Sequence, residues 1–316
     1  MKKHNANEAT ELPPGMERLL AGYADHCRMN GLRESSVTLC LKVDRWFLEN
    51  LAAVGCECPK QIDARNVAAA CLALKSNYYL STVKTFLRAL AEMQKTDCDY
   101  SSVVPAFKRP QPMPTVYSEN EIRQFEKQIR ERCCKRNYAM VLLATRLGIR
   151  SGDIARIRLS DVDFSAETIR ISQQKTEAEI KLPLVPGVRA ALLDYLDNSR
   201  PECGSPYVFV REKPPYDDQP LKISYIGNMV RRNLDHSGVV KGDRHGGPHS
   251  FRSSLASSMV NDGVSYDVIR KALGHVDKNA IKSYAKLDVE KLRGYALPVP
   301  KAAGGFADFL SGKAVL

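Results

Sequence analysis

Four side chains in the C-terminal quarter of the sequence have the types and the spacing that phosphate chemistry requires. His249 and Arg252 are three residues apart, His275 follows them, and Tyr284 comes nine residues after His275. A guanidinium group binds two phosphate oxygens at once, and an imidazole exchanges protons near neutral pH. A tyrosine hydroxyl becomes a nucleophile when a base accepts its proton. The series therefore suits a tyrosine nucleophile that acts on a phosphate group.

Local signals position three of these groups. Pro248 favours the first position of a helix, which predicts that His249 and Arg252 project from the same side of its first turn. Gly274 suits the left-handed position at the end of a short helix. That ending would hold His275 at a turn instead of inside a helix.

Each residue has an ordinary structural explanation when it is taken alone. An arginine is usually a solvated or salt-bridged surface group, and a tyrosine at helical spacing more often belongs to a core. Tyr266 and Tyr295 also lie near Tyr284 in the sequence, but neither has its spacing from Leu-Gly-His. His236 and His245 lack a partner at such a spacing. The ordered combination carries the functional interpretation.

The order H-x-x-R, then L-G-H, then tyrosine resembles the C-terminal signature of the tyrosine recombinase, or phage integrase, family. The segment TRLGIRSGDI resembles the family's first arginine box, with Arg150 as its arginine and Asp153 as its acidic residue, where glutamate is commoner. Lys175 matches the family's lysine between two β-strands. Ser253 stands where the family often has histidine, and neither departure removes a catalytic group. The likeness covers roughly residues 12 to 290.

The resemblance implies a role for each member of the set. The two arginines would fork onto non-bridging phosphate oxygens, and the second histidine would donate a further hydrogen bond. The first histidine would accept the tyrosine proton, and the lysine would protonate the departing 5′ oxygen. The product would be a 3′-phosphotyrosyl link, formed without metal or cofactor. The predicted catalytic residues are Arg150, Lys175, His249, Arg252, His275 and the nucleophile Tyr284, with Asp153 in support.

Charge and composition agree with a DNA substrate. The formal net charge is +11, with 15 Lys and Arg against 12 Asp and Glu before residue 116, and 32 against 24 after it. Both parts are basic, which favours a polyanionic partner through phosphate contacts. The first fifteen residues are polar and no run of about eighteen apolar residues occurs, so we expect a cytoplasmic, nucleoid-associated protein. The nine cysteines lack metal-ligand spacing, so we expect reduced thiols.

The pattern predicts a mainly α-helical protein of two domains. Apolar residues at helical spacing predict four helices in the N-terminal part, the third capped by Asp63. The segment PAFKRPQPMPT interrupts any regular pattern with four prolines and predicts a linker. The resemblance implies that the four-helix domain has a SAM-like fold and is the core-binding domain. The expected parts are a disordered N-terminus (1–11), the core-type DNA-binding domain (12–104), the linker (105–116), the catalytic domain (117–297) and a C-terminal tail (298–316).

The larger domain is expected to be helical with a small antiparallel β-sheet. Ser118 and Glu121 have the spacing of a capping box at its first helix. Alternating residues at 168–172 and 180–184 predict a β-hairpin or a small three-stranded sheet, with Lys175 at the turn. Helices are expected over residues 118–133, 135–147, 151–158, 187–199, 222–236, 249–261, 265–273 and 277–285.

The resemblance also implies partners: double-stranded DNA, a homo-tetramer in the synaptic complex that is a monomer or weak oligomer when free, and accessory DNA-bending or excisionase proteins. Phe306, Phe309 and Leu310 in the tail resemble the family's segment that docks on a neighbouring protomer. A type IB topoisomerase uses a similar residue set and remains an alternative, as does a non-catalytic DNA-binding protein on the same scaffold. The target sequence and the direction of the reaction stay open.

Overall fold

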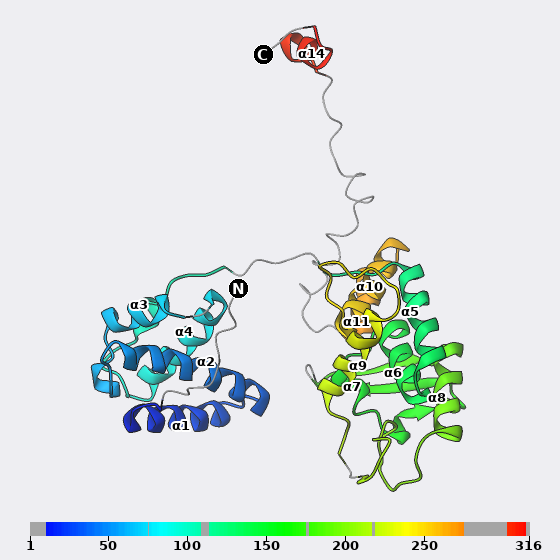
Figure 1. Cartoon of the computed structure of the whole chain (residues 1–316), viewed down its shortest axis with the longest axis horizontal. Helices are drawn as coiled ribbons and strands as arrows, with labels where there is room; N and C mark the ends of the chain where they lie inside the picture. Colours follow the sequence, from blue (N-terminus) through cyan, green and yellow to red (C-terminus); the bar gives the residue numbers. More distant parts are fainter. Residues whose placement is uncertain are drawn as a thin grey trace. The chain divides into compact units, whose positions relative to one another are not determined.

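The computed structural model describes residues 11–74, 76–108, 114–174, 177–216, 219–274 and 302–313. The chain divides into two compact units, residues 1–111 and residues 112–316 (Figure 1).

The first unit contains the four predicted helices. The cap of the third helix is confirmed, because Asp63 Oδ1 accepts a hydrogen bond from the Asn66 N–H at 2.7 Å. Short 3-10 turns at Pro59–Gln61, Asn77–Tyr79 and Tyr100–Ser102 complete the described part of the unit. The helices are α1 (Pro14–Met29), α2 (Glu34–Ala53), α3 (Ala64–Leu72) and α4 (Leu80–Glu92).

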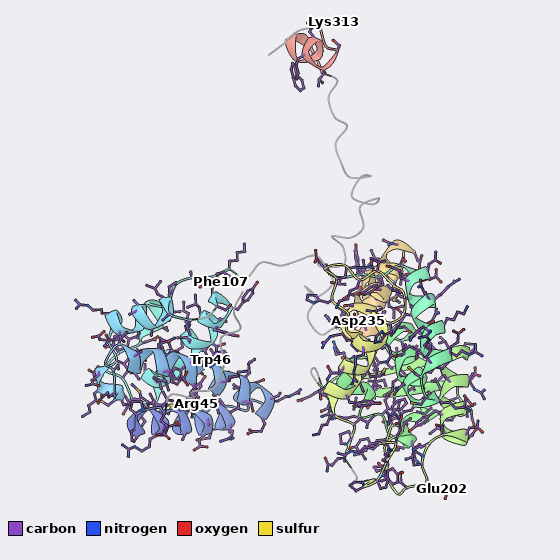
Figure 2. All side chains as sticks on the ribbon, in the orientation of Figure 1. Arg45, Trp46, Phe107, Glu202, Asp235 and Lys313 are labelled. Atoms are coloured by element: carbon purple, nitrogen blue, oxygen red, sulfur yellow. The ribbon has the colours of Figure 1, made fainter. Side chains whose placement is uncertain are left out.

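Aromatic rings fill the core of the first unit. Phe86 of α4 meets Tyr23 of α1 edge-on, with 4.8 Å between ring centres, and Phe47 of α2 at 6.4 Å. Asp44 of α2 is fully buried beside this core. Trp46 of α2, labelled in Figure 2, lies against Tyr79 with 5.4 Å between ring centres.

The second unit is helical around a small sheet. The predicted capping box is confirmed at the start of α5, where Ser118 Oγ accepts from the Glu121 N–H and Glu121 Oε2 accepts from the Ser118 N–H. Every predicted helix end in the described part of this unit lies within one residue of its observed position, except in α7, and the helix predicted over residues 277–285 lies outside the described residues. The helices are α5 (Glu119–Arg132), α6 (Lys135–Arg146), α7 (Ser151–Ile154), α8 (Pro186–Asn198), α9 (Ile223–Asp235), α10 (Pro248–Asn261) and α11 (Tyr266–Leu273), and a further helix, α14 (Gly304–Leu310), lies near the C-terminus.

The sheet has the order β1-β2-β3 and is antiparallel throughout. Strands β2 (Thr168–Ser172) and β3 (Glu179–Pro183) form the predicted hairpin, and the short edge strand β1 (Val162–Asp163) makes the sheet three-stranded, which was the second predicted form. Ile169 and Ile171 are buried while the residues beside them are not, so one face of β2 packs on the core.

Helix α6 runs through the core of the second unit and packs against α5, α8 and α10 (Figure 1). Residues 139–145 are buried without interruption, which explains why this helix lacks a polar stripe. Helix α10 is buried on most of its surface too. The elements before Arg150 and around Arg252 are therefore held by the core.

The predicted helix over 151–158 is too long. Helix α7 ends at Ile154, because the chain then becomes extended to pair with a distant loop. The N–H of Val208 donates to the carbonyl of Ile157 at 2.8 Å, and Arg158 forms a β-bridge with Tyr207. This long-range pairing overrides a local helical pattern.

All nine cysteines are free thiols. Within the described ranges, no helix is both long and apolar enough to cross a membrane. The same residues contain no group of three or more His, Cys, Asp or Glu arranged to hold a metal ion.

Candidate active site

Four of the predicted site residues lie in the described part of the second unit: Arg150, Asp153, His249 and Arg252. Lys175, His275 and Tyr284 lie outside the described residues. The chain is described, however, up to Gln174, just before Lys175, and up to Gly274, just before His275.

Arg150 is the N-cap residue of α7. The loop before it turns at Gly148, whose φ of 62° is the left-handed conformation that favours glycine. A Cβ there would also come within 2.9 Å of the Leu273 side chain. The loop that leads to Arg150 therefore lies close against the end of α11.

Asp153 connects Arg150 to the β-hairpin. Its side chain is 3% exposed, and Oδ2 lies 3.9 Å from Nη1 of Arg150. Oδ1 accepts a hydrogen bond from the N–H of Gln174 at 2.9 Å. A buried carboxylate thus faces the guanidinium group on one side and the main chain next to Lys175 on the other.

Arg252 joins two further segments. Its Nη1 donates to the carbonyl of Gly148 at 2.7 Å, and its Nη2 donates to the carbonyl of Leu273. Arg252 is 2% exposed, although His249, three residues earlier on α10, is exposed. The shared first turn of α10 therefore presents the imidazole to solvent and the guanidinium to the protein interior.

The carbonyl of Leu273 also accepts a hydrogen bond from Nε2 of Gln173 at 3.0 Å. Gly274 follows in the predicted left-handed conformation, with φ of 61°. A Cβ at this position would lie 2.3 Å from Nε2 of Gln173. The hairpin and α10 thus meet at the carbonyl of Leu273, and Arg252 binds the loop of Gly148 as well.

The sequence pattern did not single out Gln173 or Glu126. Glu126 of α5 is buried and accepts hydrogen bonds from Nε of Arg146 at 2.9 Å and from Oγ1 of Thr145 at 2.5 Å. The hydrogen bonds to Glu126 raise the pKa of Arg146. This pair anchors the end of α6 that leads to Arg150. Neither Gln173 nor Glu126 has a sequence signal beyond its type, because each acts through contacts with residues that are distant in the chain.

His249 lines a cavity of about 630 Å³. The cavity wall comes from α9, the loop between α9 and α10, the start of α10 and the chain around Thr115. The basic residues on it make an anionic ligand favourable. They are Arg231, Lys241, Arg244, His245 and His249.

Known proteins resemble the chain across both units. The family model described as the phage integrase family matches residues 116–291. The "Putative integrase/recombinase y4gC" of Sinorhizobium fredii is 38% identical over 166 residues, which cover 52% of this chain and 83% of that protein. For y4rA of the same organism the identity is 39% over 168 residues, and the chain spans only 40% of that relative's length.

A crystal structure of a lambda integrase dimer bound to a COC′ core site has the same fold. Its TM-score is 0.67 at 16% identity, and the match covers 91% of this chain and 99% of that one. Because the family model covers more than half of the sequence, the chain belongs to the phage integrase family of tyrosine site-specific recombinases.

Proposed function

We propose that the chain cuts and rejoins DNA at one phosphate held by Arg150, Lys175, His249, Arg252 and His275, with Tyr284 as the nucleophile. The observation that carries this proposal is the position of Arg252 between the carbonyls of Gly148 and Leu273. Those carbonyls stand two residues from Arg150 and two residues from His275. This contact holds the chain before Arg150 next to the chain before His275, which supports a common site for the two side chains.

In the cleavage step, Oη of Tyr284 bonds to phosphorus and the bond from phosphorus to the 5′ oxygen breaks. The tyrosine proton passes to His249, and Lys175 gives a proton to the departing oxygen. The exposure of His249 in a basic cavity supports its assignment as the acceptor. Because the phosphotyrosyl ester keeps the bond energy, a 5′-hydroxyl from a second strand can reseal it.

The two arginines contribute in different ways. Arg150 is 22% exposed and can reach a phosphate oxygen, while buried Asp153 holds it at 3.9 Å without reacting. Arg252 binds the carbonyls of Gly148 and Leu273, and its buried positive charge would stabilise the negative charge that develops on the phosphate.

We further propose that the substrate is double-stranded DNA and that four protomers act together, because exchange between two duplexes needs four cuts. The first unit would bind the core site and residues 105–116 would link the units. Phe306, Phe309 and Leu310 of α14 are exposed and would dock on a second copy of this chain. Integration or excision of a mobile element, or a related recombination, fits this chemistry. The reaction would take place on the nucleoid in the cytoplasm, with accessory DNA-bending or excisionase proteins.

A nicked DNA substrate that traps the covalent intermediate tests the nucleophile. Tyr284→Phe should bind DNA with near-normal affinity and leave no covalent complex. Tyr266→Phe is the matched control, because Tyr266 is 44% exposed on α11 and lacks the spacing from Leu-Gly-His. A covalent complex that persists in Tyr284→Phe rules out the assignment.

The topoisomerase alternative has its own test. A recombinase joins strands from two sites, whereas a type IB topoisomerase relaxes supercoiled plasmid as a monomer. We expect products from a two-site recombination assay, and plasmid relaxation without recombinant products would favour the alternative.

A further inference from the structure

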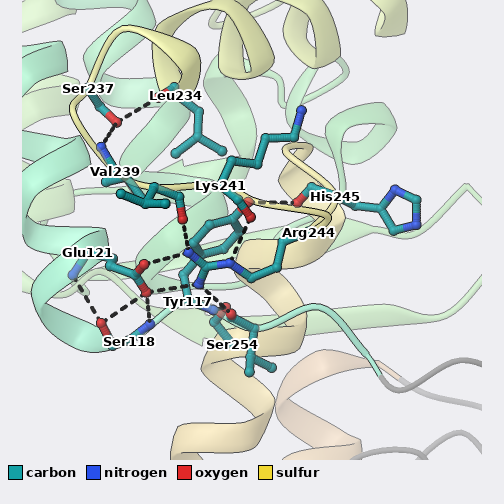
Figure 3. A network of polar contacts seen from close by, with 12 residues as sticks. Tyr117, Ser118, Glu121, Leu234, Ser237, Val239, Lys241, Arg244, His245 and Ser254 are labelled. Atoms are coloured by element: carbon teal, nitrogen blue, oxygen red, sulfur yellow. Dashed lines mark hydrogen bonds and ion pairs between the residues drawn. The ribbon is translucent and has the colours of Figure 1, made fainter.

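The loop between α9 and α10 carries Arg244, whose guanidinium group binds the start of α5. Nη1 donates to Oε2 of Glu121 at 3.0 Å and Nη2 donates to Oε1 at 2.6 Å, so the pair is bidentate (Figure 3). Nη1 also donates to the carbonyl of Val116 at 3.1 Å, and Nε donates to that of Lys241 at 3.1 Å. One side chain thus fastens the loop to the first residues of the second unit.

The Arg244–Glu121 pair is ionic and has little freedom to move. The hydrogen bonds from Arg244 lower the pKa of Glu121 to about 2, and hydrogen bonds from Ser118 act in the same direction. The guanidinium carbon of Arg244 lies 4.2 Å from the centre of the Tyr117 ring. A planar fork held by a carboxylate, a ring and several carbonyls cannot rotate without losing them.

Tyr117 ties the same region to α10. Its hydroxyl donates to the carbonyl of His245 at 3.0 Å, and its main-chain N–H donates to Oγ of Ser254 at 2.8 Å (Figure 3). The ring is 4% exposed and lies 5.6 Å from the ring of Phe251, centre to centre. Tyr117 therefore contacts both the loop and the helix that carries His249.

The main chain of His245 is held on both sides. Ser250 Oγ donates to its carbonyl at 2.6 Å, and its N–H donates to Oγ1 of Thr115 at 3.2 Å. Two glycines at 246–247 follow, and glycine has the weakest backbone preference of all residues. The contacts at His245 and Ser250 therefore decide how the chain enters α10, and His249 lies between them.

We propose that Tyr117, Glu121 and Arg244 are positioning residues for His249, which hold the loop entering α10 and so aim the imidazole into the basic cavity. This inference rests on the proposed function, because that function gives His249 its part in cleavage. Thr115, at the end of the proposed linker, belongs to the same hydrogen-bond network as the loop before His249.

Tyr117→Phe is the mildest test, because it removes one hydroxyl and keeps the ring and the N–H. The rate constant for single-turnover cleavage of a nicked substrate should fall about tenfold near pH 7, with DNA affinity unchanged within about twofold. The deficit should shrink toward about pH 9.5, where Tyr284 ionises more readily without a base. A purely structural role would not change the pH profile.

Arg200→Lys is the matched control. Arg200 binds the carbonyls of Ser205, Tyr207 and Val208 in a different loop of the same unit. This variant should lose stability and still cleave at the parent rate. An equal loss of cleavage in Arg200→Lys and Tyr117→Phe, tracking their stabilities, overturns the inference.

Combination with His249→Ala separates this inference from the proposed function. If Tyr117 acts through His249, Tyr117→Phe should cause no further loss of cleavage in the His249→Ala background. A further loss of about tenfold there, or parent-like cleavage by Tyr117→Phe alone, overturns the inference and leaves the proposed function standing. Parent-like cleavage by His249→Ala overturns both. If Tyr117→Phe does not fold, Glu121→Gln enters the same cycle with the same expectations.

Discussion

The guanidinium group of Arg252 donates a hydrogen bond to the main-chain carbonyl of Leu273, which joins the first turns of α10 to the last residue of α11. The contact is buried, and Gln173 of the hairpin binds the same carbonyl. Chain segments on either side of the site are therefore coupled through one oxygen atom. Two predictions below concern this contact, and two concern the carboxylates of Glu121, which is paired, and Asp44, which is buried.

Arg252→Lys should abolish most cleavage while it keeps the positive charge. A lysine ammonium cannot span the carbonyls of Gly148 and Leu273 together. We expect cleavage to fall at least about 100-fold and the free energy of unfolding to fall by about 2 kcal/mol. Covalent trapping and urea unfolding measure the two effects. Arg123→Lys, on the exposed face of α5, should change neither, and a parent-like Arg252→Lys would contradict the assignment.

Gly274→Ala should impair cleavage more than its backbone strain explains. Both Gly274 and Gly263 have left-handed φ angles, but a Cβ at 263 meets nothing within 4 Å, whereas one at 274 overlaps Gln173. We expect Gly263→Ala to cost about 1 kcal/mol of stability and to cleave normally. Gly274→Ala should displace Gln173 from the Leu273 carbonyl and slow cleavage.

The double variant Gly274→Ala/Gln173→Ala checks the cause of that loss. Removing the glutamine side chain relieves the overlap, so part of the stability should return although the φ strain remains. Unfolding by urea gives the comparison. Equal stabilities for the single and double variants would show that the overlap does not matter.

Glu121 should make the second unit sensitive to acid. Its pKa is about 2 in the fold, mainly because Arg244 donates to it, against an ordinary value of 4.5. The stabilisation from the pair is therefore complete above about pH 4.5 and is lost as the pH falls toward 2. Glu121→Gln should cost about 2 kcal/mol near pH 6 and progressively less below pH 4.5.

Amide hydrogen exchange over residues 119–132 measures this effect, because it reports on α5 alone. Glu119→Gln is a suitable control, since the Glu119 side chain is 67% exposed in its pair with Arg123. A difference between the parent and Glu121→Gln that stays constant between about pH 6 and pH 3 contradicts the prediction.

Asp44→Asn should stabilise the first unit at neutral pH. Among the described residues, neither carboxylate oxygen of Asp44 has a hydrogen-bond partner, and burial raises its pKa well above the ordinary 3.8. Burial raises the pKa of Tyr23 and of Cys40 on the same core, and the charge of Asp44 adds to both shifts. A raised carboxyl pKa gives stability that is greatest at low pH and is lost as the pH rises.

Trp46 is the single tryptophan of the chain and lies on α2, so its fluorescence follows the unfolding of the first unit. We expect Asp44→Asn to gain about 1 kcal/mol or more near pH 7.5 and little near pH 4. Asp25→Asn is the control, because that side chain is 73% exposed. A gain of equal size at both pH values would contradict the expected ionisation.

Local signals in the sequence predict the elements well where neighbours in the chain decide the conformation. The capping box of Ser118 and Glu121, the cap at Asp63 and the left-handed Gly274 all act within a few residues, and all are confirmed. Ser265 is the N-cap residue of α11, but its side chain makes no capping hydrogen bond. The helix over 151–158 is too long because a distant loop pairs with its second half.

The sequence by itself determined the family, the order of the proposed catalytic residues and most element boundaries, because these depend on residue type and on short spacings. Only the tertiary structure decided that Arg252 is buried while His249 is exposed, and that Gln173 and Arg252 meet at one carbonyl. It also decided the partnership of Arg244 with Glu121, which are 123 residues apart. Such contacts arise when separate segments pack on one core, and no local pattern encodes which surfaces will meet.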